Sequence, residues 1–204
     1  MNDRWFWSLE GSGEYSVASA IKFIDDQRLV GSPHKTRWIK VIPIKINILA
    51  WKVRFEFLPT RLNLSRRGIE IQSLCCPICF KEVESTSHIF FTCSLVRDVY
   101  HKIASWWELT YSEFVSYEDW SAWMLCLRIT SKHKVMLDWI FYVTWWLVWN
   151  HRNKLLFDTK SPSKLIVFYE LVSRSFYWCR YRCKASFSWL EWMKIRILFL
   201  CNLF

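Results

Sequence analysis

Apolar side chains recur at helical spacing in the first half of the chain, beginning at Pro43, a residue that fits the first turn of a helix. The lysines and arginines of the same segment fall largely on the opposite face. This pattern predicts an amphipathic helix up to Phe55, followed by a shorter helix that Thr60 caps and Gly68 ends. The apolar face of the first helix consists of Ile44, Ile48, Leu49, Trp51 and Phe55.

The C-terminal third carries the longest periodic pattern, which predicts one helix over 131–157 and a second over about 163–183. The polar stretch 158–162 ends in a proline and separates them, so the two helices are expected to form a hairpin. The longest uncharged run, 139–150, has twelve residues, whereas a membrane span needs about 20. We therefore expect a buried helix. Its inward-facing side chains are predicted to be Val135, Trp139, Tyr142, Val143, Trp146 and Trp149.

Two other segments are less regular. Residues 108–130 are acidic, aromatic and poorly periodic, which predicts a linker with at most one short helix, leading into the helical hairpin. Near the N-terminus, loosely alternating residues flank the turn signal Gly11-Ser12-Gly13, which predicts a short hairpin.

The composition excludes a disordered or low-complexity chain. Of 204 residues, 52% are hydrophobic and 19% are aromatic, and there are only four glycines and five prolines. The net charge of +10 is unevenly distributed. Residues 35–68 and 131–204 each carry a net charge of +8, while residues 69–130 between them carry −4. Two basic blocks of this kind indicate an anionic partner.

The cysteines carry the clearest chemical signal. Cys76-Pro77-Ile78-Cys79 is followed by His88 and Cys93, giving the spacing C-x2-C-x8-H-x4-C. Zn²⁺ prefers thiolate and imidazole ligands in a tetrahedron, and four protein ligands leave no open position, so the site is expected to be structural. Cys75 is an alternative first ligand, and a chance cluster of buried thiols is the alternative to a metal site. No secretory signal is visible, which favours a reducing compartment and metal binding over disulfides.

Several motifs occur in an order that resembles a known family. Together they are similar to the zinc-binding domain found toward the C-terminus of non-LTR retrotransposon polyproteins, the reverse transcriptases abundant in plants. The resemblance covers about residues 3–107, and the tail after Trp139 resembles the usual C-terminal extension of such polyproteins. It implies one structural Zn²⁺ held by Cys76, Cys79, His88 and Cys93. The segments that carry it are Trp38–Lys40, Pro43–Ile46, Leu49–Lys52, Leu58–Leu64, Arg66–Gly68, Cys76–Cys79, Glu84-Ser85 and His88–Cys93.

These observations predict a mainly α-helical protein. We expect a small zinc-stabilised helical subdomain with a short N-terminal hairpin, followed by a C-terminal helical hairpin. The expected boundaries are 1–107 for the zinc-binding domain, 108–130 for the linker, 131–193 for the helical hairpin and 194–204 for a tail.

The resemblance implies a zinc-binding accessory module of a retrotransposon reverse transcriptase, located in the nucleus. Its implied partners are RNA or DNA, bound through the phosphate backbone, and a polymerase domain, and no membrane partner is expected. The alternative function is a protein–protein docking module without nucleic-acid binding. The candidate phosphate contacts, for which a solvated helix face is the alternative, are Lys35, Arg37, Lys40, Lys45, Lys52, Arg54, Arg61, Arg66 and Arg67.

This chain alone is not expected to be an enzyme. Phe23-Ile24-Asp25-Asp26 matches the short pattern with which a reverse-transcriptase palm holds two Mg²⁺ ions. Only 22 residues precede Phe23, too few for fingers and palm, so these acids are interpreted as solvated residues at a helix end.

Overall fold

The computed structural model describes residues 6–16, 19, 23, 39–40, 42–159, 162–182 and 188–194. The chain divides into two compact units, residues 1–37 and 38–204. The second unit contains both the zinc motif and the C-terminal helices, which share one hydrophobic core. The boundary between these two units lies after Arg37.

The first unit contains a hydrogen-bonded turn. The Trp7 backbone N–H donates to the Gly13 carbonyl at 2.9 Å, and Gly13 adopts a positive φ of 72°. The Trp7 indole N–H donates to the Ser19 hydroxyl at 2.8 Å, and its ring meets the Tyr15 ring edge-on at 4.9 Å. Among residues 6–16 there is no β-strand, so the predicted hairpin is represented there only by this turn.

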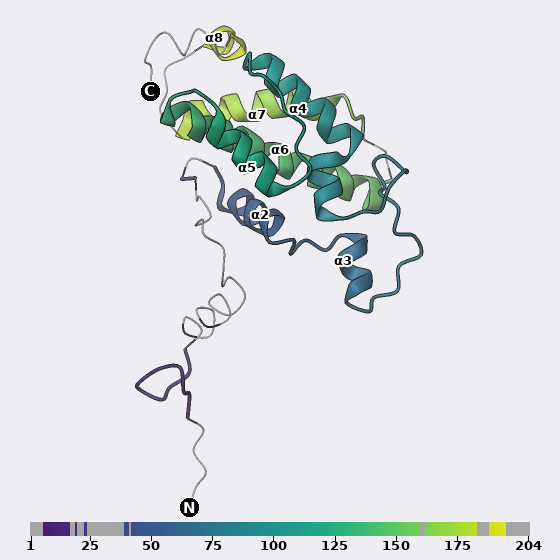
Figure 1. Cartoon of the computed structure of the whole chain (residues 1–204), viewed down its shortest axis with the longest axis vertical. Helices are drawn as coiled ribbons and strands as arrows, with labels where there is room; N and C mark the ends of the chain where they lie inside the picture. The colour runs from purple at the N-terminus through teal and green to yellow at the C-terminus, as the bar shows by residue number, and fades with distance from the viewer. Residues whose placement is uncertain are drawn as a thin grey trace, which may run out of the picture. The chain divides into compact units, whose positions relative to one another are not determined.

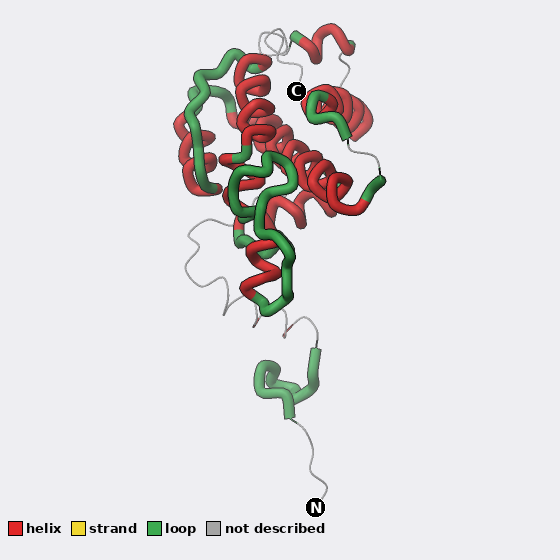
Figure 2. The backbone as a smooth tube through the Cα atoms, turned by 90° about the vertical axis from the view of Figure 1, so that its right-hand side faces the viewer, coloured by secondary structure: helices red, strands yellow, loops and turns green. Residues whose placement is uncertain are grey.

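The second unit is helical in its described part, with loops between the helices (Figure 2). Both helices predicted over 43–68 form. The Thr60 hydroxyl caps the second by accepting from the Asn63 N–H at 3.2 Å, and Gly68 follows it with a φ of 78°. The elements are α2 (Ile44–Arg54), α3 (Arg61–Arg66), η1 (His88–Thr92), α4 (Ser94–Trp106), α5 (Tyr117–Cys126), α6 (Ser131–Phe157), α7 (Ile166–Arg182) and α8 (Trp189–Met193).

Helix α6 is the central element of the second unit, because α2, η1 and α7 all pack against it (Figure 1). Its middle is therefore buried on every side, from Met136 to Val148 with the exception of the half-buried Trp146. Of the residues predicted to face inward, Trp139, Tyr142 and Val143 are buried. Val135 is exposed, since it lies in the first turns before the core begins.

Residues 108–130, expected to be a linker, contain α5 and contribute to the core. Phe114 and Trp120 are buried, and the Trp120 ring lies 4.9 Å from that of Trp145 on α6. The Ser116 hydroxyl caps α5 by accepting from the Asp119 N–H at 3.1 Å. The segment lacks a regular apolar period because its core side chains come partly from a loop and partly from a short helix.

Helices α6 and α7 pack against each other as the predicted hairpin. A cavity of about 500 Å³ between them is lined by residues that include Trp146, His151 and Arg174. His151 is buried, and that burial lowers the pKa of its imidazole. No helix in the described ranges has the length and apolar character needed to cross a membrane.

Candidate metal centre

Four side chains converge on one point between the loop that precedes η1 and η1 itself. The Sγ atoms of Cys76, Cys79 and Cys93 and a ring nitrogen of His88 all lie within 4.8 Å of one another. Cys79 Sγ lies 3.3 Å from His88 Nε2. Zinc bonds of about 2.3 Å to sulfur and 2.0–2.1 Å to nitrogen place the corners of a tetrahedron roughly 3.5–3.8 Å apart. The four atoms therefore suit one Zn²⁺ with small shifts.

The backbone holds the first two thiols in a tight turn. Cys75 and Val83 form an antiparallel bridge, and the Cys76 N–H donates to the Glu82 carbonyl at 2.7 Å. The Phe80 N–H then donates back to the Cys76 carbonyl at 2.9 Å. The C-x2-C segment is thus closed at both ends, which directs its two sulfurs to the same side.

The second pair of ligands lies across one turn of π-helix. Helix η1 begins at His88, and the Cys93 N–H donates to the His88 carbonyl at 2.8 Å. This hydrogen bond joins residues i and i+5, which a π-helical turn brings together. It therefore explains the H-x4-C spacing. Cys93 is also the N-cap of α4, where the helix dipole favours a thiolate.

The imidazole of His88 is held from its other side. Nδ1 lies 3.1 Å from the Thr92 hydroxyl and 3.4 Å from a carboxylate oxygen of Glu82. A proton on Nδ1 can be donated to these oxygens, which leaves the Nε2 lone pair directed at the cluster. The contacts therefore select Nε2 as the metal-binding nitrogen.

The protonation of Cys76, His88 and Cys93 is mutually dependent. Hydrogen bonding from the Cys93 thiol, with a further contribution from His88, lowers the pKa of Cys76 to about 3. Hydrogen bonding to the Cys76 sulfur raises the pKa of His88 to about 9 and also raises the pKa of Cys93. Without metal the Cys76 thiolate is therefore paired with a protonated His88 and a protonated Cys93, and a divalent cation would displace these protons on binding.

Cys75 does not join the cluster and remains a half-buried free thiol. Its backbone carries the structural role instead, through the bridge to Val83. The geometry thus favours Cys76 over Cys75 as the first ligand.

Phe80 has an unfavourable backbone conformation for a residue with a side chain, in the turn that holds Cys76 and Cys79. It has a φ of 58° and its side chain is 75% exposed, so it has backbone strain and little packing. We expect Phe80→Gly to raise the free energy of unfolding by roughly 0.5–1 kcal/mol without changing zinc content. Thermal unfolding of the zinc-loaded protein measures the effect. Phe80→Ala keeps the Cβ and should gain nothing, whereas a lower Tm for Phe80→Gly would contradict the argument.

Four of the predicted phosphate-binding residues are exposed in the structure. They are Lys40, Lys45 on α2, Arg66 at the end of α3, and Arg67, which caps that helix. Lys52 is half-buried at the end of α2. Lys35 and Arg37 lie outside the described residues, as do Asp25 and Asp26 of the palm-like pattern.

Lys45 and the two remaining predicted contacts, Arg54 and Arg61, have partners within the protein. The Lys45 ammonium lies 5.1 Å from the ring centre of Trp146, and the Arg54 guanidinium lies 5.5 Å from that of Tyr117. Arg61 donates to the Cys75 carbonyl at 2.6 Å and is half-buried. These cations contact other elements of the same unit, which sequence periodicity alone could not indicate.

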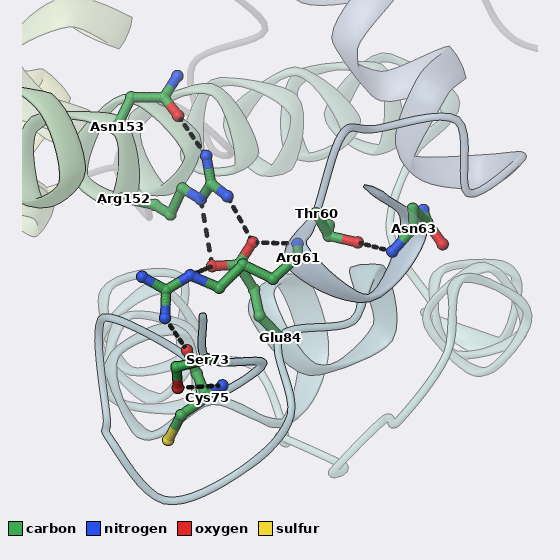
Figure 3. Close-up of polar contacts among 8 residues, drawn as sticks. All are labelled: Thr60, Arg61, Asn63, Ser73, Cys75, Glu84, Arg152 and Asn153. Carbon is green, nitrogen blue, oxygen red and sulfur yellow. Dashed lines mark hydrogen bonds and ion pairs between the residues drawn. The ribbon is translucent and has the colours of Figure 1, made fainter. Parts of the chain in front are cut away.

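The loop between α3 and η1, which contains Cys76 and Cys79, is called the metal-bearing loop below. A buried carboxylate in it, Glu84, connects this loop to α3 and α6 (Figure 3). It has no exposed surface and accepts from the Arg61 backbone N–H at 2.8 Å and from Arg152 Nη2 at 2.6 Å. The Arg61 guanidinium lies 4.0 Å from the same carboxylate, and Arg152, only 4% exposed, also donates to Asn153 at 3.0 Å. Sequence analysis recognised Glu84 only as part of a motif and missed Arg152, which lies 68 residues away.

Comparison with known proteins places the cluster in a family. No curated protein and no solved structure matches the chain. Residues 15–100 match the family described as zinc-binding in reverse transcriptase, and all four clustered ligands lie within that range. This match confirms the resemblance seen in the motifs: residues 15–100 are similar to the zinc-binding domain of reverse transcriptases, and the cluster of Cys76, Cys79, His88 and Cys93 within them is compatible with one structural Zn²⁺.

Proposed function

We propose that the protein is an accessory module that binds RNA or DNA for a reverse transcriptase, through contacts to the phosphate backbone. The observation that carries this proposal is the charge of residues 35–68, which is +8 within a chain of net charge +10. Arg66 and Arg67 support it, because they are adjacent, exposed and fixed at the end of α3. Their helix is tied to the metal-bearing loop through Glu84.

In this role the chain binds nucleic acid and catalyses no reaction itself. The family match identifies a zinc-binding domain, and four protein ligands leave Zn²⁺ no position for substrate. A polymerase domain is the proposed protein partner and the nucleus the proposed location, since both follow from action during reverse transcription.

Nucleic-acid binding is expected to weaken steeply as salt rises. Each phosphate contact contributes a slope of about −0.9 to log affinity against log salt on duplex DNA and about −0.7 on single strands. Arg66→Glu combined with Arg67→Glu should weaken binding and make that slope shallower by about one contact per residue. Fluorescence anisotropy of a labelled strand at several salt concentrations measures both quantities.

A matched control replaces two other exposed cations, Arg128 and Lys132, with glutamate. The control changes the net charge equally, so it separates a local contact from a general loss of attraction. Zinc content should stay the same in both variants, because none of the four residues is a ligand. Equal binding by the two variants would contradict a role for Arg66 and Arg67.

The alternative function, a protein–protein docking module, is supported by two exposed apolar side chains on α2. Ile44 and Ile48 lie one turn apart and are 71% and 40% exposed, an apolar face that a protein partner could cover. Failure of the wild-type protein to bind any nucleic acid at low salt would favour this alternative over the proposed function.

A further inference from the structure

The outward face of α7 carries three tyrosines. Tyr169, Tyr177 and Tyr181 are 69%, 52% and 75% exposed. Their spacing of eight and four residues places them along one side of the helix. Helix α7 packs against α6, α4 and α8 through its other side. The buried residues of that side are Val167, Leu171, Val172, Ser175, Phe176 and Cys179.

The tyrosines on this face are therefore not needed for the core. Large aromatic side chains seldom remain exposed in this number on one helix, and a cluster of them marks a binding surface more often than a single exposed ring does. The rings of Tyr177 and Tyr181 lie 6.4 Å apart with only 10° between their planes. The two exposed ring planes are therefore nearly parallel.

Arginines accompany these rings. Arg174, Arg180 and Arg182 are exposed on α7, and Lys164 precedes the helix. Glu170 is the only acidic residue in 162–182, and it pairs with Arg174 at 3.2 Å. The segment 162–182 has a net charge of +3, which suits a polyanion.

We propose that the outward face of α7 is a stacking platform for single-stranded RNA or DNA. Bases stack on exposed aromatic rings while neighbouring cations meet the phosphates, and this combination is typical of surfaces that bind single strands without sequence preference. A duplex keeps its bases stacked inside, so it can use the arginines of this face but not the tyrosines. This inference rests on the proposed function, and it places the base-stacking contact on the second basic block, in addition to the phosphate contacts proposed for residues 35–68.

A second copy of the chain is a poorer occupant of this face. Two copies would bring together two α7 faces from segments that each carry a net charge of +3, and like charges repel. Charge complementarity therefore favours a strand of phosphates.

The test compares two double variants of the full chain. Tyr177→Ser with Tyr181→Ser removes the rings, while Tyr177→Phe with Tyr181→Phe keeps them and removes only the hydroxyls. A labelled oligothymidylate strand and a labelled DNA duplex are the probes, followed by fluorescence anisotropy at fixed salt. Each lost stack is expected to weaken single-strand affinity by about fivefold to a hundredfold. The serine variant should show this loss with the single strand only, and the phenylalanine variant should bind as the wild type does.

The outcomes separate this inference from the function on which it rests. Unchanged single-strand binding by the serine variant, with zinc content and helical circular dichroism retained, overturns the platform and leaves nucleic-acid binding intact. Equal losses on single strand and duplex overturn it as well, because stacking cannot explain them. A wild-type protein that binds neither probe overturns the proposed function itself. Conversion of a dimer to a monomer by the serine variant, detected by sedimentation, would assign the face to a second copy and also overturn the platform.

Discussion

Cys79→Ser is expected to abolish stoichiometric zinc binding and to unfold the region between residues 70 and 95. Cys79 supplies one of four ligands, and its sulfur lies 3.3 Å from His88 Nε2. The segment around it has almost no regular structure apart from a single β-bridge and η1, so the metal must supply much of its stability. Structural zinc contributes about 10–16 kcal/mol in zinc-finger peptides, which is comparable to the total stability of a typical domain, about 5–15 kcal/mol. Metal analysis and hydrogen exchange measure the two effects.

Cys75→Ser is the matched control, because Cys75 is adjacent to a ligand yet lies outside the cluster. It should retain full zinc and native exchange protection. Chelation of the wild-type protein should reproduce the Cys79→Ser result, with loss of protection beginning in the metal-bearing loop. Full zinc content in Cys79→Ser, or loss of zinc from Cys75→Ser alone, would show that the ligand set is wrong.

The metal centre could be predicted from the sequence because its chemistry is local. All four ligands lie within 18 residues, and each pair is closed by a hydrogen bond of short range. Helices α2 and α3 were predicted for the same reason, since the spacing of their apolar residues and their caps are visible in a short window. The π-helical turn from His88 to Cys93 was not predicted, although the x4 spacing is a signal for it.

The long-range packing could not be predicted from a short window of sequence. Residues 108–130 resemble a linker in sequence, and only the packing of Phe114 and Trp120 in the core shows otherwise. Helix α6 has no single apolar stripe because other elements pack around its whole circumference. The same limit applies to the basic residues. Whether Arg61 faces solvent or a buried carboxylate depends on Glu84, which lies 23 residues further along the chain. A pattern of Lys and Arg therefore identified a basic segment but not which of its cations are accessible.

The second large effect is expected at the contact between Glu84 and Arg152. Both side chains are buried, and two guanidinium nitrogens reach the carboxylate, Nη2 at 2.6 Å and Nε at 3.3 Å. Removing one partner leaves the other charged and uncompensated in the interior, which typically costs about 3–5 kcal/mol. Arg152→Met keeps most of the side-chain volume while removing the charge. We expect it to lower the free energy of unfolding by that amount, measured by urea denaturation with zinc present.

The exposed pair on α7 provides the control. Arg174 and Glu170 are separated by four residues and 3.2 Å, with side chains that remain 43% and 36% exposed. Pairs of this kind contribute about 0.3–0.5 kcal/mol, so Arg174→Met should cost far less than Arg152→Met. Combining Arg152→Met with Glu84→Gln should recover part of the lost stability, because the buried negative charge of Glu84 is then removed as well. If Arg152→Met proved no more destabilising than Arg174→Met, the Glu84 contact would be incidental, and α6 would be held to the metal-bearing loop by apolar packing alone.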